Sequence, residues 1–346
     1  MMNETGTEWM SPKRRFLSGL FGGRVDRPSA ATLTSTATVE LMKKTNCFFP
    51  DVHLNYEQMA RLAATSYEVL GYDSIMPLFS TITESAALDV PTNWGHREGW
   101  PVHTAHPVTD PGEISLPKDF LERPSMDTAL NAIKLLRREY GDHVAIIGKV
   151  FGPWSLAYHL VGTEPFLMDT ILNPDKVRAY LEKLLPISLL SGQAQILAGA
   201  DAILWCDHAT GDLVSPACYR DFLLPIHSRV TKSRELGVPI ALHICGNTTK
   251  MLPYIVQAGF DAFHFDSKVD ARVGKEITGR KMTLAGGINN AVTLMTGSVD
   301  DVAAAARYVL EAGVEIASPE CAIPLSTPTE NLQIITSVAK EFGARA

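Results

Sequence analysis

A histidine and a cysteine stand two residues apart in the segment "ALHICGN" (241–247). The apolar run before them predicts a β-strand, in which residues i and i+2 point to the same face, so His243 and Cys245 should project together. An imidazole beside a soft thiolate suits zinc, but two ligands do not hold the ion. Cys321 lies 76 residues further on (321 − 245) and could supply the third ligand. Two cysteines and one histidine leave the fourth tetrahedral position for a substrate, whereas the alternative, in which these side chains only pack, stays open at this point.

The elements that must position these residues alternate between strands and helices along most of the chain. Such an order implies right-handed βαβ units with a parallel sheet, and eight repeats favour a closed (β/α)₈ TIM barrel. Active sites of these barrels lie at the carboxyl ends of the strands. The eight expected strands are 29–37, 73–79, 144–150, 201–207, 239–245, 262–266, 282–288 and 315–321.

Two segments stand apart from this regular pattern. Residues 1–27 are mostly polar and contain a short expected helix that begins after Ser11, so we expect an N-terminal helical extension. Residues 28–346 then form one barrel domain. A long insertion at about 80–125, rich in proline, histidine and tryptophan, reads as an irregular functional loop.

Reactive side chains gather at the carboxyl ends of the expected strands. These positions are Cys206-Asp207-His208, His243-Ile244-Cys245, His264-Phe265-Asp266 and Glu320-Cys321. The opposite strand ends carry mainly proline, glycine, aspartate and alanine. This asymmetry indicates an enzyme.

Composition narrows the class of partner. The net charge is −7, which argues against nucleic acid or an anionic membrane, and no apolar run is long enough to cross a bilayer. No secretory signal pattern is present, so we expect a cytoplasmic protein. The five cysteines are an odd number and are widely spread along the chain, so their pattern is not typical of a disulfide-bonded framework. The sequence leaves a homodimer open.

Four segments carry a resemblance to a known family. "LHICGN" followed far downstream by "ASPECAIPLSTPTENL" resembles the corrinoid-dependent methyltransferases of the uroporphyrinogen decarboxylase superfamily, which include methylcobamide:coenzyme M methyltransferases and methyltransferase I components of O-demethylases. "SPKRRFLSGLFGGRVDRPS" resembles the opening helix of that superfamily, and "KVFGPWSLAYHLVG" resembles its third-strand segment. The resemblance implies a zinc ion held by His243, Cys245 and Cys321.

The resemblance also implies two directions of methyl transfer. The favoured hypothesis is a methyltransferase I that moves methyl from an aryl methyl ether, of the guaiacol or veratrol type, to cobalt(I). The alternative moves methyl from a methylated corrinoid (cobalamin) protein to a thiol such as coenzyme M. "PECAIP" departs from the "PGCG" typical of the coenzyme M branch, through Glu320 and Ala322, and this departure favours the ether. In both cases the corrinoid is expected on a separate protein, because the chain has no D-x-H-x-x-G motif.

Two further alternatives stay open. Porphyrinogen decarboxylation is disfavoured because true decarboxylases carry an arginine-rich "RQAGR"-type motif where this chain has "TLTSTATVEL". The second alternative is a non-catalytic barrel that holds a structural zinc ion.

The resemblance gives the remaining strand-end residues provisional roles. Asp207 would orient a ligand or bind substrate, and His208 would supply a proton. Glu84 would be an exchangeable fourth ligand or a proton donor. His264 and Asp266 would contact substrate. Each of these residues could instead serve only in loop capping or packing.

Aromatic residues supply an expected substrate pocket. The insertion contributes Trp94, His96, Trp100 and His103, and Trp154 would form a floor. The alternative is a surface loop whose aromatic residues are incidental, with Trp154 packing at a helix start.

Overall fold

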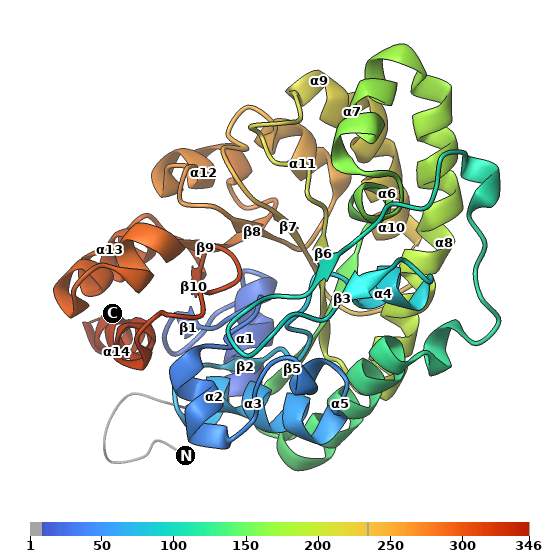
Figure 1. The fold of residues 1–346 in the computed structure, drawn as a ribbon. Coiled ribbons are helices and arrows are strands. Elements are labelled where there is room, and N and C mark those ends of the chain that lie inside the picture. The colour runs from blue at the N-terminus through green and yellow to red at the C-terminus, as the bar shows by residue number, and fades with distance from the viewer. Residues whose placement is uncertain (1–8, 234, 346) are drawn as a thin grey trace.

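The structure is a computed structural model that describes residues 9–233 and 235–345. Parallel strands lie at its centre and helices surround them (Figure 1). The eight strands of the central sheet are β1 Ser29–Ala30, β2 Ser74–Ile75, β5 Ala145–Phe151, β6 Ala202–Cys206, β7 Ile240–Ile244, β8 Ala262–Phe265, β9 Thr283–Ile288 and β10 Ile316–Pro319.

The order of the strands is that of a closed barrel. It runs β1-β10-β9-β8-β7-β6-β5-β2, so the first two strands of the sheet stand at its two ends. A backbone hydrogen bond from Asp73 N–H to Ala30 O (2.8 Å) joins these ends, and the Ser74 hydroxyl donates to Thr32 O (2.9 Å). The TIM barrel predicted from the sequence is confirmed.

Each predicted strand segment contains a strand, but the first two strands are only two residues long. The segment after β1 makes local bonds in place of ladder bonds. The Thr32 hydroxyl donates to Thr34 O (2.7 Å), and Thr34 N–H donates back to that hydroxyl (3.3 Å). Threonine side chains compete with the sheet for backbone groups in this way.

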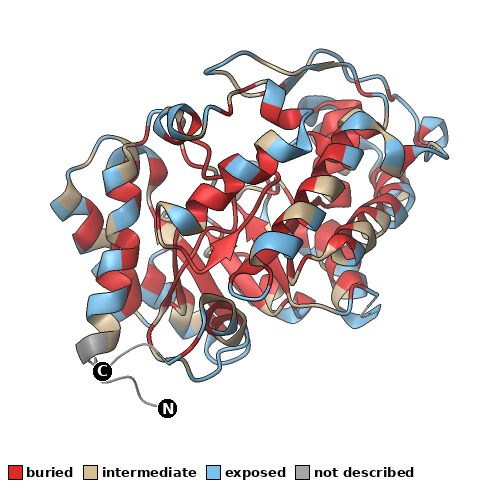
Figure 2. Cartoon of the chain, turned by 90° about the horizontal axis from the view of Figure 1, so that it is seen from below, coloured by how far each residue is buried: buried red, intermediate tan, exposed pale blue. Residues whose placement is uncertain are grey.

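Most helices bury one face against the strands and expose the other, as the red inner and pale blue outer faces show (Figure 2). This is the usual amphipathic pattern of a barrel's outer layer. The helices are α1 Pro12–Leu20, α2 Val39–Thr45, α3 Tyr56–Glu68, α4 Thr83–Ala87, α5 Pro124–Tyr140, α6 Pro153–Val161, α7 Thr163–Leu172, α8 Pro174–Ala198, α9 Pro216–Cys218, α10 Leu224–Ser233, α11 Leu252–Ala258, α12 Ala271–Thr278, α13 Val299–Glu311 and α14 Thr329–Arg345. Short 3₁₀ or π turns are η1 Asp51–His53, η2 Pro111–Glu113, η3 Phe120–Glu122, η4 Tyr219–Leu223 and η5 Asn290–Met295.

Helix α1 covers the N-terminal end of the barrel, on the far side of the strands in Figure 1. The Ser11 hydroxyl caps it by accepting from Arg14 N–H, as the sequence predicts. Its residues Phe16 and Leu20 are buried. The helix packs directly on β1, β5 and β10. The domain boundary expected after residue 27 stays a prediction.

The insertion at 80–125 holds α4, η2, η3 and an antiparallel hairpin of β3 Thr92–Asn93 with β4 Val102–His103. The Ser85 hydroxyl hydrogen-bonds both His103 Nε2 (2.8 Å) and Nδ1 of His159 in α6 (3.1 Å). The hairpin is therefore fastened to the carboxyl end of the barrel. None of the helices in the described residues has the length and apolarity to span a bilayer.

Candidate metal centre

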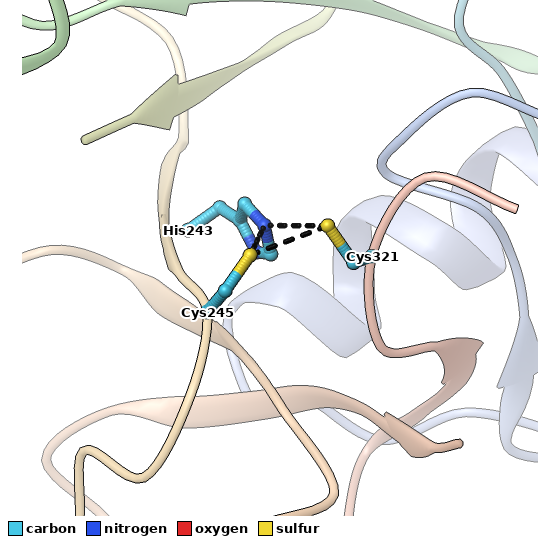
Figure 3. A group of neighbouring side chains, drawn as sticks. All are labelled: His243, Cys245 and Cys321. Atoms are coloured by element: carbon cyan, nitrogen blue, oxygen red, sulfur yellow. Dashed lines mark hydrogen bonds between the residues drawn. The ribbon is translucent and has the colours of Figure 1, made fainter. Parts of the chain in front are cut away.

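Three potential ligand atoms converge at the carboxyl end of the barrel (Figure 3). Cys245 Sγ lies 3.0 Å from His243 Nε2 and 3.2 Å from Cys321 Sγ, and Cys321 Sγ lies 3.5 Å from His243 Nε2. His243 is buried at the end of β7, while both cysteines are partly exposed. The sequence-predicted ligands are thus brought together from strands on different sides of the barrel.

The turn after β7 requires glycine. Gly246 has φ +79°, and a Cβ there would lie 2.1 Å from the Thr210 hydroxyl. Its N–H donates to Asp266 Oδ2 (2.8 Å), and Lys268 N–H donates to Asp266 Oδ1 (2.9 Å). Both carboxylate oxygens of Asp266 hold backbone turns, and this positions the Cys245 loop. The substrate-binding role expected for Asp266 stays a prediction.

Glu320 fixes the other ligand segment. Its carboxylate accepts from Ser267 N–H (2.8 Å), Asn289 Nδ2 (3.0 Å) and Asn290 N–H (2.9 Å), and so ties the loops after β8 and β9 to the residue before Cys321. The side chain is buried. Glu320, which stands where the coenzyme M branch has glycine in "PGCG", therefore anchors these loops.

A buried histidine behind His243 sets its tautomer. His264 Nε2 lies 2.8 Å from the Pro319 carbonyl oxygen, which requires the proton on that nitrogen. Burial and the neighbouring His243 lower the pKa of His264 to about 3, so its Nδ1 carries a lone pair. That Nδ1 accepts from His243 Nδ1–H at 2.8 Å, which leaves the lone pair of His243 Nε2 facing the two sulfurs. Metal-binding histidines are usually oriented in this way.

His264 is enclosed within the protein in this arrangement. The ring is fully buried, and both of its nitrogens bond within the protein, so that it orients His243. The substrate contact expected for His264 stays a prediction.

The two thiols share one negative charge. A hydrogen bond from the Cys245 thiol and the nearby His243 lower the pKa of Cys321, although burial opposes this. The Cys321 thiolate, together with burial, raises the pKa of Cys245. A dication would favour loss of the second proton, because zinc is bound by thiolates.

The donor set fits zinc. Tetrahedral zinc, with bonds of about 2.3 Å to sulfur and about 2.0 Å to nitrogen, separates its ligand atoms by about 3.5–3.8 Å. The observed triangle of 3.0, 3.2 and 3.5 Å is slightly tighter than this. Among the described residues, the cluster of ligand atoms within 4.8 Å of one another contains only His243, Cys245 and Cys321. We refer to these three residues as the triad.

His208 lies beside the triad. Its partly exposed ring is 5.4 Å from that of Phe151 and 5.9 Å from that of His159, between centroids. Burial and the nearby His243 lower the pKa of His208, with Cys321 acting in the opposite direction. The ring is therefore neutral near pH 7 and able to accept a proton. Its predicted catalytic role stays a prediction.

Asp207 is buried in a hydrogen-bond network. It is 1% exposed, and its carboxylate accepts from Ser155 N–H (2.9 Å), Trp205 Nε1–H (3.1 Å) and His227 Nε2–H (2.8 Å). These bonds join β6, α6 and α10. The catalytic role expected for Asp207 stays a prediction.

Glu84 lies deep in the barrel wall. Its Oε1 accepts from the Ser191 hydroxyl (2.9 Å) and from Phe151 N–H (3.3 Å), whereas Oε2 is buried without a hydrogen-bond partner in the described part of the chain. Burial raises its pKa. Glu84 is outside the triad's ligand cluster, and its expected roles as an exchangeable fourth ligand or a proton donor both stay predictions.

The predicted aromatic residues divide into two groups. Trp154 is 1% exposed and packs edge-on against Phe166 at 4.9 Å between centroids, in the helical layer, and its expected place as a pocket floor stays a prediction. His96 is exposed on the hairpin. Trp94 and Trp100 are partly buried, and substrate contact by them stays a prediction.

Sequence reasoning missed Lys149 and His53. Lys149 is buried on β5, and His53 in η1 is 2% exposed. The available signal for Lys149 is a charged residue inside the apolar run "VAIIGKVF". No comparable sequence signal marks His53.

The fold and the triad together define a TIM-barrel protein with an open candidate metal centre at its mouth. Residues 11–342 match the family model "Uroporphyrinogen decarboxylase (URO-D)". A methylated-thiol–coenzyme M methyltransferase of Methanosarcina mazei is 32% identical, over 96% of this chain and 90% of its own. The methylcobamide:CoM methyltransferase MtaA of Methanosarcina barkeri is also 32% identical, over 96% and 98%. A solved methyltransferase from Methanosarcina mazei superposes with a TM-score of 0.93 at 31% identity, over 96% of this chain and 99% of that one.

The chain belongs to the uroporphyrinogen decarboxylase family and, within it, to the corrinoid-dependent methyltransferases. It is therefore an enzyme of the methyltransferase class. The resemblance stated from the sequence is confirmed.

Proposed function

We propose that this protein transfers a methyl group from a methylated corrinoid protein to a thiol held at the triad. The observation that carries the proposal is the convergence of His243 Nε2 with the sulfurs of Cys245 and Cys321 at the barrel mouth. The relatives named above, which act on coenzyme M by their names, support a thiol as acceptor. The proposal reverses the preference for an aryl ether that the sequence suggested.

The chain's own residues prepare the site for a metal ion. His264 holds the His243 lone pair toward the mouth, while Asp266 and Glu320 fix the segments that bear the two cysteines. A zinc ion there would act as a Lewis acid that favours the thiolate form of an acceptor thiol. Two cysteines and one histidine leave a tetrahedral position for that sulfur.

The proposed transfer is a nucleophilic displacement at the methyl carbon. The thiolate sulfur donates an electron pair to the methyl carbon, and a C–S bond forms as the cobalt–carbon bond breaks. The electron pair of the broken bond stays on the corrinoid, which leaves as cobalt(I). The thiol proton must leave before transfer, and we propose His208 as the group that accepts it.

The corrinoid is proposed to arrive on a separate protein that docks at the mouth, and the cytoplasm is the proposed location. The homodimer that the sequence leaves open stays a prediction.

An aryl methyl ether donor is the second candidate. Trp94 lies 6.0 Å from His53 and Trp100 lies 5.0 Å from Phe49, between ring centroids, so aromatic surfaces are available in the insertion. Aromatic substrates pack well on such surfaces.

One spectroscopic assay separates the candidates. Zinc-loaded protein is mixed with methylcobalamin and 2-mercaptoethanesulfonate, and in a parallel arm with cobalt(I) corrinoid and guaiacol. We expect loss of methyl-cobalt absorbance in the first arm only, and no loss with Cys321→Ala. Formation of methyl-cobalt in the guaiacol arm alone would establish the second candidate instead.

A further inference from the structure

Lys149 is a buried cation without an ionic partner. The residue is 4% exposed, and its ammonium Nζ makes a single long hydrogen bond, 3.5 Å to the Phe79 carbonyl oxygen. Nζ also lies 5.5 Å from the centroid of the Phe151 ring. Within residues 9–233 and 235–345, no carboxylate stands within 4.0 Å of it. Buried lysines are almost always paired, because an isolated charge in the interior is costly.

The ammonium lies among groups from several sides of the mouth. Burial lowers the pKa of Lys149, and negative charge on Cys206, Glu84 and Cys321 acts in the opposite direction. The same ammonium contributes to the lowered pKa of His208. These groups come from β6, from α4 and from the segment after β10, so the cation is within electrostatic reach of the triad.

Two further polar groups beside Lys149 lack partners. Neither ring nitrogen of His53 has a hydrogen-bond partner in the described part of the chain, although the ring is 2% exposed and contacts Phe49 at 4.4 Å between centroids. The Lys149 ammonium adds to burial in lowering the pKa of His53. Glu84 Oε2 is likewise unpartnered. Buried polar atoms are normally bonded, so these three residues have bonding capacity that a ligand could use.

We propose that Lys149, with His53 beside it, binds the anionic end of the acceptor and makes the enzyme selective for short thiols that carry a sulfonate or carboxylate. This inference rests on the proposed function. The sulfur of such an acceptor would lie at the triad, and its charged end would complete the bonding of Lys149. Lys149 is thus a specificity-determining residue. The competing role is a permanent counter-charge for Glu84.

The first test needs no methyl transfer. Ethanesulfonate carries the anionic end but no thiol, and its binding to zinc-loaded protein is measured by calorimetry. We expect Lys149→Met to weaken binding about 10- to 100-fold, the usual range for one charge-assisted hydrogen bond, and Lys149→Arg to weaken it less. Exposed Lys134 on α5 provides the matched control, Lys134→Met, which should bind like the parent. Equal binding by the parent and Lys149→Met would overturn the inference.

The second test compares acceptors. Methyl transfer from methylcobalamin is measured with 2-mercaptoethanesulfonate and with neutral 2-mercaptoethanol. In Lys149→Met, kcat/KM should fall about 10- to 100-fold more for the anionic thiol, mainly through KM. An equal fall for both thiols would overturn the inference in favour of the counter-charge role. Failure of the parent protein to methylate either thiol would contradict the proposed function, and the ethanesulfonate result would still decide the role of Lys149.

Metal content and the thermal midpoint of each variant show whether it is folded. Methionine has nearly the length of lysine, and replacing a buried charge by an apolar side chain of similar volume is often neutral or stabilising. Lys149→Met should therefore keep its metal and its midpoint.

Discussion

Asp73, near the N-terminal end of the barrel, accepts hydrogen bonds from Arg15, Arg27, the Ser29 hydroxyl and Ala30 N–H. Lys149, near the carboxyl end, has a single long bond to a carbonyl. Both residues are buried, so burial alone does not separate them. The difference lies in hydrogen bonding: the Asp73 network is complete within the chain, whereas the group around Lys149 has bonding capacity left for a partner from outside. We infer that the first end serves stability and the second serves binding.

The largest effect is expected at the carboxyl end from Cys321→Ala. Loss of a thiolate leaves two protein ligands, so zinc measured by plasma emission after gel filtration should fall far below stoichiometric, and methyl transfer should stop. The matched control is Cys218→Ala on α9, which should keep its metal because Cys218 lies outside the triad. Full retention of zinc by Cys321→Ala would disprove the ligand assignment.

The N-terminal end should respond to Arg15→Met through stability. Arg15 bonds Asp26 and Asp73 and is fully buried, and breaking such a pair leaves uncompensated charge worth about 3–5 kcal/mol. Urea unfolding measures the loss, while zinc content per folded chain should stay unchanged. The control is Arg138→Met at an exposed pair with Glu139, where little change is expected. A loss of zinc without a loss of stability in Arg15→Met would contradict the division between the two ends.

A smaller effect is expected from His264→Gln. Residues that orient metal ligands typically contribute about 10- to 100-fold in affinity, so competition with a chelator should show weakening in this range. His227→Gln is the control, because His227 is also buried but bonds Asp207 and Tyr219 instead of the triad. If both variants hold zinc like the parent, the orienting role of His264 is wrong.

The smallest effect is a difference in acid sensitivity between the two ends. Burial, with a contribution from Lys149, lowers the pKa of His53 to about 3, below the value of about 6.5 in an unfolded chain. The unfolded state then binds a proton first, so this contribution to stability declines as pH falls from about 6.5 to 3. Urea unfolding at a series of pH values should show a shallower slope in this window for His53→Gln.

The N-terminal end should respond only in stronger acid. Burial raises the pKa of Asp26, but bonds from Arg15 and from Met10 N–H outweigh it and bring the pKa to about 2. Its contribution is therefore present above about pH 4 and declines between about 4 and 2. Asp26→Asn should remove that decline and, because it also breaks the buried pair with Arg15, lower stability at neutral pH. A parallel pH curve for His53→Gln and the parent above pH 4 would contradict this order.

The fold could be predicted from the sequence because the strands are apolar runs separated by amphipathic helices. The end of β1 could not, because the local bonds between Thr32 and Thr34 replace ladder bonds without changing the apolar pattern. The triad could be predicted because His243 and Cys245 share a strand face, and because the resemblance pointed to Cys321.

The remaining site residues show where sequence reasoning ends. Asp207, His264 and Asp266 all follow or end strands, and position alone does not tell a side chain that faces a substrate from one that bonds its neighbours. Their partners, such as His227 for Asp207, come from distant parts of the chain. Lys149 was missed because the strand around it is apolar on both faces, and its sequence does not show that a single lysine there points inward.

The central claim is that a thiol sulfur joins His243, Cys245 and Cys321 around one zinc ion. X-ray absorption at the zinc edge, recorded before and after addition of 2-mercaptoethanesulfonate, counts the sulfur neighbours of the metal directly. We predict two sulfur neighbours before the addition and one more after it. An unchanged number of sulfur neighbours in protein that methylates the thiol would contradict the account.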